Sequence, residues 1–126
     1  MIRPIQTPDA PQAIGAYSQA IVAGDFLFIS GQLGLDPATM TLREGFEAQC
    51  HQMFQNLRAI AESAGVGLDR AVKLTIFLTD LADFAQLNTI MAQYVPEPFP
   101  ARAAVQVSAL PKGGLVEADA ILYLGR

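Results

Sequence analysis

Alternating apolar and polar positions predict a chain of short strands interrupted by two helices. The first two strand-like runs, Ser18–Ala23 and Phe26–Ser30, flank Gly24-Asp25, a dipeptide that is typical of a tight hairpin turn. Before them, residues 1–16 are rich in proline and glycine and predict an irregular, partly extended lead-in. After them, Gly31–Thr41 is broken by further glycine and proline and predicts a loop.

A first helix is predicted next, behind the capping-box pattern of Thr41 followed by Glu44. Gly65 is placed to end this helix, because glycine adopts the left-handed conformation that often closes a helix. Apolar residues between these ends recur at alternating steps of four and three, the spacing of one helix face. They are Phe46, Cys50, Met53, Leu57, Ile60 and Ala64.

The second half of the chain predicts a strand, a helix and two more strands. Residues 72–79 alternate in the period of a strand with one face in the core, and Asp80 is placed to cap a helix that proline residues end. Two last strands, about 101–108 and 115–124, flank Leu110–Gly114, which we interpret as hairpin turn chemistry. The apolar positions of the second helix are Phe84, Leu87, Met91 and Tyr94.

This order of elements predicts an α+β fold in which two helices cover one face of a mixed sheet, as a single domain over residues 1–126. The chain is 52% hydrophobic and 16% charged, which excludes intrinsic disorder. No segment approaches the roughly 18 apolar residues of a membrane helix. The other face of the sheet also carries apolar residues, so we expect a homo-oligomer that covers it.

Charge and cysteine content narrow the partners and the compartment. The formal net charge is -4 and there is no basic run, so we do not expect a nucleic-acid partner, which normally requires many cationic contacts. The single cysteine, Cys50, cannot form an internal disulfide. The N-terminal residues have neither a signal-peptide nor a transit-peptide pattern. We expect a cytoplasmic protein.

Several kinds of chemistry are disfavoured by what the sequence lacks. Cys50 and His51, the single cysteine and histidine, are adjacent and point about 100° apart on a helix, so they form no dyad. Cys50 falls on the apolar stripe and is interpreted as a core thiol, whereas His51 is expected to be solvated. The sequence has neither a zinc ligand set nor a phosphate-binding glycine loop. We therefore expect neither metal nor cofactor.

Arg102 and Glu117 are the polar residues in strand-like surroundings that could bind or act on a ligand. Arg102 stands among alanines, which leaves its guanidinium open to a carboxylate; the alternative is a surface arginine on an edge strand. Glu117 and Arg102 could equally form an ion pair between neighbouring strands, and the spacing does not decide whether they share a sheet face. Tyr17, Ser30 and Asn88 could be ordinary surface residues.

Ordered short motifs along the whole chain resemble the RidA family, also called the YjgF family, of reactive-intermediate or imine deaminases. No single motif is specific, but their order and spacing together are. They are Ala10-Pro11, Ile14–Gln19, Ser30–Gln32, Gln49, Asn56-Leu57, Ala64-Gly65, Val72-Lys73, Asp80, Phe84, Asn88, Phe99–Arg102, Val105, Leu110-Pro111 and Glu117.

The resemblance implies a chorismate-mutase-like α+β fold that forms homotrimers with ligand clefts between subunits. It implies hydrolysis of 2-iminobutanoate and 2-iminopropanoate to 2-oxo acids and ammonia without a cofactor, a protective activity that removes a damaging metabolite. Alternatives are a non-catalytic trimeric sensor of small 2-oxo acids or carboxylates, an aminoacrylate deaminase of pyrimidine breakdown, and a less favoured RNA-directed activity.

Site residues are implied position by position. Arg102 matches the arginine that grips the substrate carboxylate, and Glu117 matches the glutamate that positions or activates water. Ala104 stands where the family has a cysteine whose main-chain carbonyl contacts the imine nitrogen, so alanine can serve but a thiol role is excluded. Ala16 and Gln106 also depart from the family pattern. Further residues matched to the cleft are Tyr17, Ser30, Gly31 and Asn88.

Overall fold

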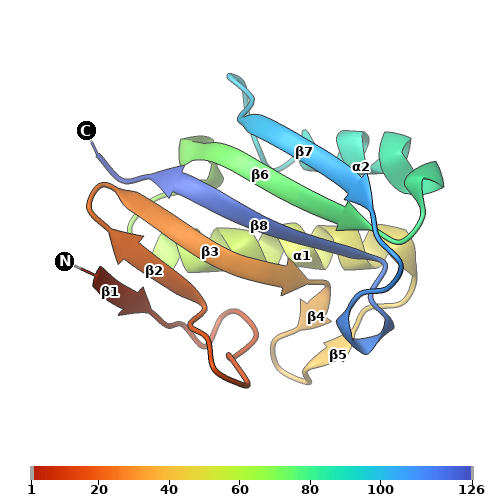
Figure 1. Ribbon diagram of the computed structural model, residues 1–126, viewed down its shortest axis with the longest axis horizontal. Coiled ribbons are helices and arrows are strands. Elements are labelled where there is room, and N and C mark those ends of the chain that lie inside the picture. The colour runs from red at the N-terminus through yellow and green to blue at the C-terminus, as the bar shows by residue number, and fades with distance from the viewer. Residues whose placement is uncertain (1, 126) are drawn as a thin grey trace.

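The computed structural model describes residues 2–125, and within that range six strands form one mixed sheet in the order β1-β2-β3-β8-β6-β7 (Figure 1). All neighbouring strands run antiparallel except β6 and β7, which are parallel. A small β4–β5 hairpin stands apart from this sheet. The strands are β1 (Ile2–Ile5), β2 (Ala20–Ala23), β3 (Phe26–Leu33), β4 (Leu35–Asp36), β5 (Thr41–Leu42), β6 (Ala71–Leu78), β7 (Ala101–Gln106) and β8 (Val116–Tyr123).

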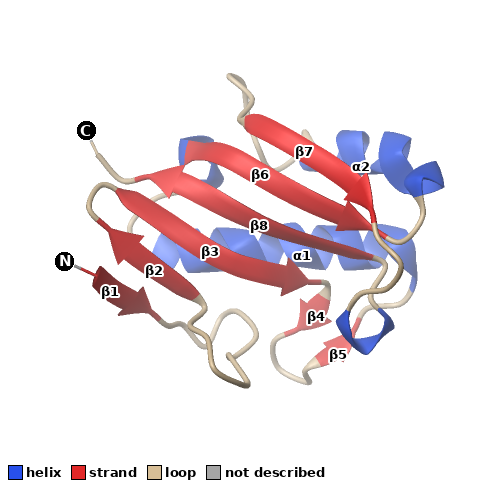
Figure 2. Cartoon of the chain, viewed as in Figure 1, coloured by secondary structure: helices blue, strands red, loops and turns tan. Residues whose placement is uncertain are grey.

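Helices α1 (Gly45–Ser63) and α2 (Phe84–Met91) both lie against the same face of the sheet, and α2 is the crossover between the parallel strands β6 and β7 (Figure 2). This confirms the predicted α+β fold with two helices on one face. Short 3₁₀ turns at Leu68–Arg70, Leu81–Asp83 and Pro111–Gly113 complete the elements. No helix among residues 2–125 is long and apolar enough to span a bilayer.

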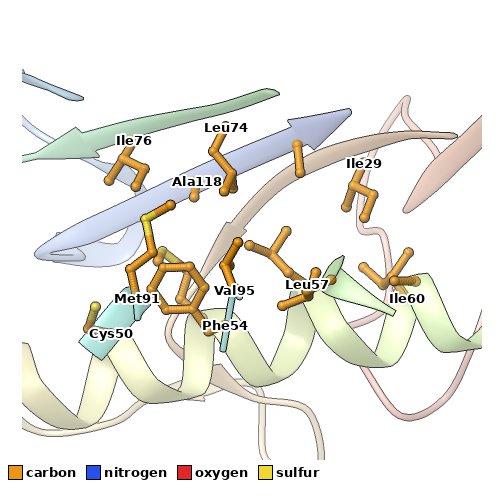
Figure 3. Close-up of a cluster of buried hydrophobic side chains, with 14 of the residues drawn as sticks. Ile29, Cys50, Phe54, Leu57, Ile60, Leu74, Ile76, Met91, Val95 and Ala118 are labelled. Atoms are coloured by element: carbon orange, nitrogen blue, oxygen red, sulfur yellow. The ribbon is translucent and has the colours of Figure 1, made fainter. Parts of the chain in front are cut away.

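The core fills the layer between α1 and the sheet, as Figure 3 shows. The predicted stripe of α1 is buried from Phe46 to Ile60, and Ala64 packs half-buried at its end. Each fully buried Leu, Ile or Phe side chain contributes about 1.5–3 kcal/mol to stability. The sheet contributes alternate side chains to the same layer; in β8 they are Val116, Ala118, Ala120 and Leu122.

The capping box predicted at the start of α1 is wrong. Thr41 belongs to β5, where it pairs with Asp36, and its hydroxyl is hydrogen-bonded to Thr39. Glu44 is itself the N-cap residue, in an extended conformation and without a side-chain cap bond. At the other end the prediction is confirmed: Gly65 has φ +88°, and its N–H donates to Glu62 O at 2.9 Å.

The loop predicted over Gly31–Thr41 is wrong in its first part, because β3 continues to Leu33 across a bulge. Ile29 pairs with Ala120 and Gln32 with Ala118, so Ser30 and Gly31 together stand opposite one residue of β8. A bulge adds one residue and bends the strand, which a period-two pattern does not anticipate.

Two further expectations need correction in β6 and α2. Val72 lies at an irregularity of the β6–β8 pairing and is 41% exposed, although the alternation placed it in the core. Asp80 accepts a hydrogen bond from Ala82 N at 2.9 Å and caps the 3₁₀ turn that leads into α2. Phe84 is 37% exposed, and Tyr94 lies beyond the end of α2 at Met91.

Leu110–Gly114 is not a hairpin turn between neighbouring strands. β6 lies between β7 and β8, and both pair with β6 rather than with each other. The segment is a connection across β6, which no local turn signal could indicate. The interpretation of Arg102 and Glu117 as an ion pair of neighbouring strands is therefore also wrong.

Candidate functional site

One cavity, of about 510 Å³, lies beside Glu117 on the face of the sheet that the helices leave open. Its walls come from the loop before β2, from the β3 bulge, from the β4–β5 turn and from the connection before β8. Of the predicted site residues it contains Tyr17, Ser30, Gly31 and Glu117. Predicted residues from three separate parts of the sequence, Tyr17, Ser30–Gly31 and Glu117, are thus brought together.

Gly31 and Glu117 are in close contact in this cavity. A Cβ added to Gly31 would lie 2.6 Å from Glu117 Oε2, which is closer than real Cβ atoms approach. The carboxylate therefore lies directly over the α-carbon of the bulge residue. Bulges are common next to active sites, where they re-aim a side chain or open a space. Here the bulge opens the space that the Glu117 carboxylate fills.

The surroundings of Glu117 make its carboxyl group a weaker acid than an exposed glutamate. Burial raises the pKa of this carboxyl group, and the nearby Asp119 carboxylate raises it further. Asp119 lies on the same sheet face, with its own pKa raised by burial and lowered in part by a hydrogen bond from Thr75 and the charge of Lys73. A glutamate whose pKa is shifted toward neutrality is suited to exchange a proton with a ligand or with water.

Hydrogen bonds fix the walls around Glu117. Ser30 Oγ donates to Ser18 O at 2.6 Å, which ties the bulge to the preceding loop. Gln19 is buried, and its side chain accepts from Thr7 N and donates to Pro11 O at 2.7 and 2.8 Å, which holds the loop that carries Pro11. Tyr17 is 51% exposed, so its ring lies at the surface of the cavity.

A second cavity, of about 460 Å³, contains Arg102 and Asn88. Arg102 Nη1 donates to Asn88 Oδ1 at 2.7 Å, and the guanidinium lies over the Phe84 ring, 5.2 Å from its centre. Met91 Sδ lies 3.6 Å from the same nitrogen. These contacts orient the guanidinium and leave other N–H groups for a carboxylate.

Ala104 lies on β7 two residues after Arg102. Val107 N donates to Leu78 O, so the backbone groups of Val107 point toward β6. Because these groups alternate in direction along a strand, those of the other odd-numbered residues of β7 also point toward β6. The carbonyl of Ala104 consequently points away from β6, at the outer edge of the sheet. A main-chain acceptor is thus available near Arg102, as the resemblance requires.

Arg102 and Glu117 lie on opposite faces of the sheet. Arg102 pairs with Leu74, which points into the helix layer, whereas Glu117 pairs with Phe77, which points to the open face. The spacing left this open, and the register decides it. One chain therefore holds two separate halves of the candidate site, one with Arg102, Asn88 and Ala104 and the other around Glu117.

The cysteine and the histidine belong to neither half. Cys50 is fully buried, and burial raises the pKa of its thiol to about 12, with a smaller contribution from Asp83. This agrees with its interpretation as a core thiol. His51 is half-buried rather than solvated, because its Nδ1 is 2.8 Å from the hydroxyl of Tyr94.

Two groups of residues near the first cavity were missed as contributors to it. Gln49, buried on α1, accepts from Leu115 N at 2.8 Å and donates to Arg43 O, and so fixes the start of β8 two residues before Glu117. Its place in a family motif was the only signal for it. Met40 and Lys112 also line the cavity, and nothing in the sequence pattern marks them.

Comparison with known proteins agrees with this geometry. A profile of the family described as Endoribonuclease L-PSP matches residues 7–124. The RutC family protein y4sK of Sinorhizobium fredii is 50% identical over 125 residues, 98% of this chain and 99% of that protein. The 2-iminobutanoate/2-iminopropanoate deaminase of Bos taurus is 47% identical over 122 residues, 96% of this chain and 89% of that protein.

A solved structure extends the likeness to the fold. The crystal structure of RidA from the Antarctic bacterium Psychrobacter sp. PAMC 21119 superposes with a TM-score of 0.94 at 58% identity, covering 96% of this chain and 98% of that one. Because profile, sequence and structure agree over nearly the whole chain, the family resemblance is confirmed, and the chain belongs to the Endoribonuclease L-PSP family, which is the RidA (YjgF) family.

Proposed function

We propose that this protein is a cofactor-independent deaminase of the cytoplasm that hydrolyses 2-iminobutanoate and 2-iminopropanoate to 2-oxo acids and ammonia. The observation that carries the proposal is that the two cavities hold complementary groups. One contains Arg102, which is hydrogen-bonded to Asn88, and the other contains Glu117, whose pKa is raised. The name of the Bos taurus relative supports the same reaction.

The two halves lie on opposite sheet faces, so we propose that they meet between subunits of a homotrimer. The Arg102 side of one subunit then faces the Glu117 side of the next, a head-to-tail contact that can close into a ring. The open face supports this arrangement, since Phe28 and Val105 are each 44% exposed on it. A second copy would cover this apolar surface.

In the proposed reaction Arg102 binds the substrate carboxylate through paired hydrogen bonds. The Ala104 carbonyl accepts a hydrogen bond from the imine N–H, and the imine carbon is thereby held toward Glu117 of the adjoining subunit. Holding the reactants in place can lower the barrier by several kcal/mol. Tyr17 and Ser30 form the wall of the cleft.

Glu117 accepts a proton from water as the water oxygen bonds to the imine carbon, and the C=N π electrons become a lone pair on nitrogen. Glu117 returns this proton to the nitrogen, which gives the neutral carbinolamine. The carbinolamine hydroxyl then passes its proton through Glu117 to the amine as the C–N bond breaks, so that ammonia leaves and the C=O bond of the 2-oxo acid forms. Assistance from a general base contributes roughly 10²–10⁴ in rate. This is sufficient for an imine, which already reacts with water.

The test is imine hydrolysis with an amino acid oxidase that generates the imine in situ and semicarbazide that traps what remains. Wild-type protein is expected to reduce the trapped imine, and Arg102→Ala and Glu117→Gln are each expected to abolish the effect. Activity of either variant equal to wild type would contradict the assigned roles. Saturable binding of 2-oxo acids without hydrolysis would favour the sensor instead.

Mixing the two inactive variants tests the shared site directly. After dissociation and reassembly together, about a quarter of head-to-tail interfaces combine an intact Arg102 with an intact Glu117, so a corresponding fraction of activity is expected to return. Each variant reassembled alone is the control. A site confined to one chain would recover nothing on mixing.

RNA cleavage is not proposed for this chain, although the family description names an endoribonuclease. The net charge of -4 opposes binding to a polyanion. The single histidine, a common general base, is bound to Tyr94 and lines neither of the two cavities.

A further inference from the structure

The cavity beside Glu117, as a single chain forms it, is larger than a four-carbon substrate requires. Its volume of about 510 Å³ falls in the range, about 300–1,000 Å³, of pockets that enclose drug-sized ligands. The catalytic groups occupy only part of the lining. Which substrate side chains the rest of the lining can accommodate is therefore a separate question from which residues carry out the reaction.

Met40 and Lys112 share a conformation that other non-glycine residues between positions 2 and 125 avoid. Their φ angles are 59° and 60°, and they are the only non-glycine residues of that range with positive φ. Both line the cavity. They come from the β4–β5 turn and from the connection before β8, which Figure 1 places at the same end of the sheet.

Backbone strain of this kind costs about 1–3 kcal/mol for each residue and persists where its surroundings enforce it, often at ligand sites. The Met40 turn is closed by a hydrogen bond from Met40 N to Asp36 O at 2.7 Å, and Arg43 forms an ion pair with Asp36 at 3.3 Å. The turn thus holds Met40 at the cavity wall despite the unfavourable φ.

The chemistry of this wall is apolar and adaptable. Ile14 and Leu35 line the same cavity as Met40. A methionine side chain is unbranched and polarizable, and fits ligands of varied shape. Such a wall accommodates an unbranched hydrocarbon chain, whereas a charged chain has a partner only where Lys112 or Glu117 lines the cavity.

We infer that Met40 is a specificity-determining residue, and that this cavity is a side-chain subsite for 2-imino acids with unbranched apolar chains longer than ethyl. The inference rests on the proposed deaminase function and extends its substrate range. The competing outcome is a subsite that selects acidic side chains, because these would pair with the cationic Lys112 on the cavity lining.

The experiment compares 2-iminohexanoate with 2-iminopropanoate, in wild-type protein and in Met40→Gly. Glycine adopts positive φ freely, so this variant keeps the turn while removing the wall. Its kcat/KM for 2-iminohexanoate is expected to fall by about tenfold or more, and that for 2-iminopropanoate to stay within about twofold. Ala38→Gly, exposed on the same turn and outside the cavity lining, controls for loop flexibility.

An equal effect of Met40→Gly on both substrates would overturn the inference, and so would a wild-type protein that hydrolyses 2-iminohexanoate at least about tenfold less efficiently than the short imine. Preference for 2-iminobutanedioate that Lys112→Met abolishes would assign the subsite to acidic chains instead.

Binding of 2-oxohexanoate and 2-oxopropanoate, measured by calorimetry, separates this inference from the proposed reaction. If Met40→Gly selectively loses affinity for 2-oxohexanoate and the protein turns over no imine, the proposed deaminase function would be contradicted and the proposed subsite supported. If Met40→Gly leaves the affinities for both acids unchanged, the subsite inference would be contradicted.

Discussion

The Glu117 carboxylate lies against the α-carbon of Gly31, with Oε2 2.6 Å from where a Cβ would be. Gly31 adopts no positive φ, so its small size rather than its conformational freedom matters here. The β3 bulge and the β8 carboxylate fit together only if position 31 carries no side chain. This relationship links a strand irregularity to the placement of the proposed base.

Gly31→Ala is expected to displace the Glu117 carboxylate and to lower kcat for imine hydrolysis by about 100-fold, since a shift near 1 Å can have that effect. KM is expected to change little, because Arg102 is untouched. Steady-state kinetics with in situ imine measures both constants.

Gly24→Ala is the matched control for this change. Gly24 has φ +60° in the β2–β3 turn and no atom within 4 Å of its added Cβ, so the variant loses stability without touching the cavity. Activity lost equally in both variants would show that Gly31 acts only through the fold.

Glu117→Gln is expected to stabilise the protein relative to the wild type, by an amount that increases as pH rises. The carboxyl has an ordinary pKa of 4.5 in the unfolded chain and a raised pKa in the folded protein, so the unfolded state ionises first. Wild-type stability is therefore lost as pH rises from 4.5 through the raised value, and glutamine, which does not ionise, avoids that loss.

Urea unfolding at a series of pH values measures this difference. The two proteins are expected to converge in acid and to separate toward neutral pH, with the glutamine variant the more stable. Glu62→Gln, on the exposed side of α1, is the control. A stability difference that is the same at every pH would contradict the prediction.

Asn88→Ala removes the side chain that braces Arg102. Since a hydrogen bond to a charged group contributes about 1.5–3 kcal/mol, KM is expected to rise about tenfold or more, with kcat nearly unchanged. Inhibition by the product 2-oxo acid should weaken in parallel. Thr89→Ala, on the exposed neighbouring position of α2, is the control. A fall in kcat at constant KM would contradict this role.

Asn56→Ala is expected to destabilise the protein by about 3 kcal/mol, because it leaves buried carbonyl groups without donors. Asn56 is fully buried and donates to Leu33 O at 3.1 Å and to Leu35 O at 2.9 Å. These bonds attach α1 to the end of β3. Gln55→Ala, on the exposed side of the same helix, is expected to change stability much less in urea unfolding.

The elements were predictable where burial repeats locally along the chain. The stripe from Phe46 to Ile60 and the alternation from Val116 to Leu122 follow directly from packing against one layer. Thr41 and Glu44 formed a plausible capping box, but Thr41 instead pairs with Asp36 across the β4–β5 turn. Pairing between strands overrides such a local preference.

The site was predictable in its residues and not in its arrangement. The family motifs identified Arg102 and Glu117, yet their placement on opposite faces follows from the insertion of β6 between β7 and β8 and from the register in which β6 pairs with each. That insertion is a long-range event with no local mark in the sequence. Met40 was missed for another reason: a positive φ at methionine arises from the surrounding turn and not from residue type.

The position of β8 has a consequence for how the protein folds. It is the last strand along the described chain, yet it lies between β3 and β6 at the centre of the sheet. During synthesis β3 and β6 therefore have no common neighbour until β8 emerges from the ribosome. Such distant pairing slows folding, so the nascent chain exposes the apolar strands on both sides of the vacant position until β8 is available to pair with them.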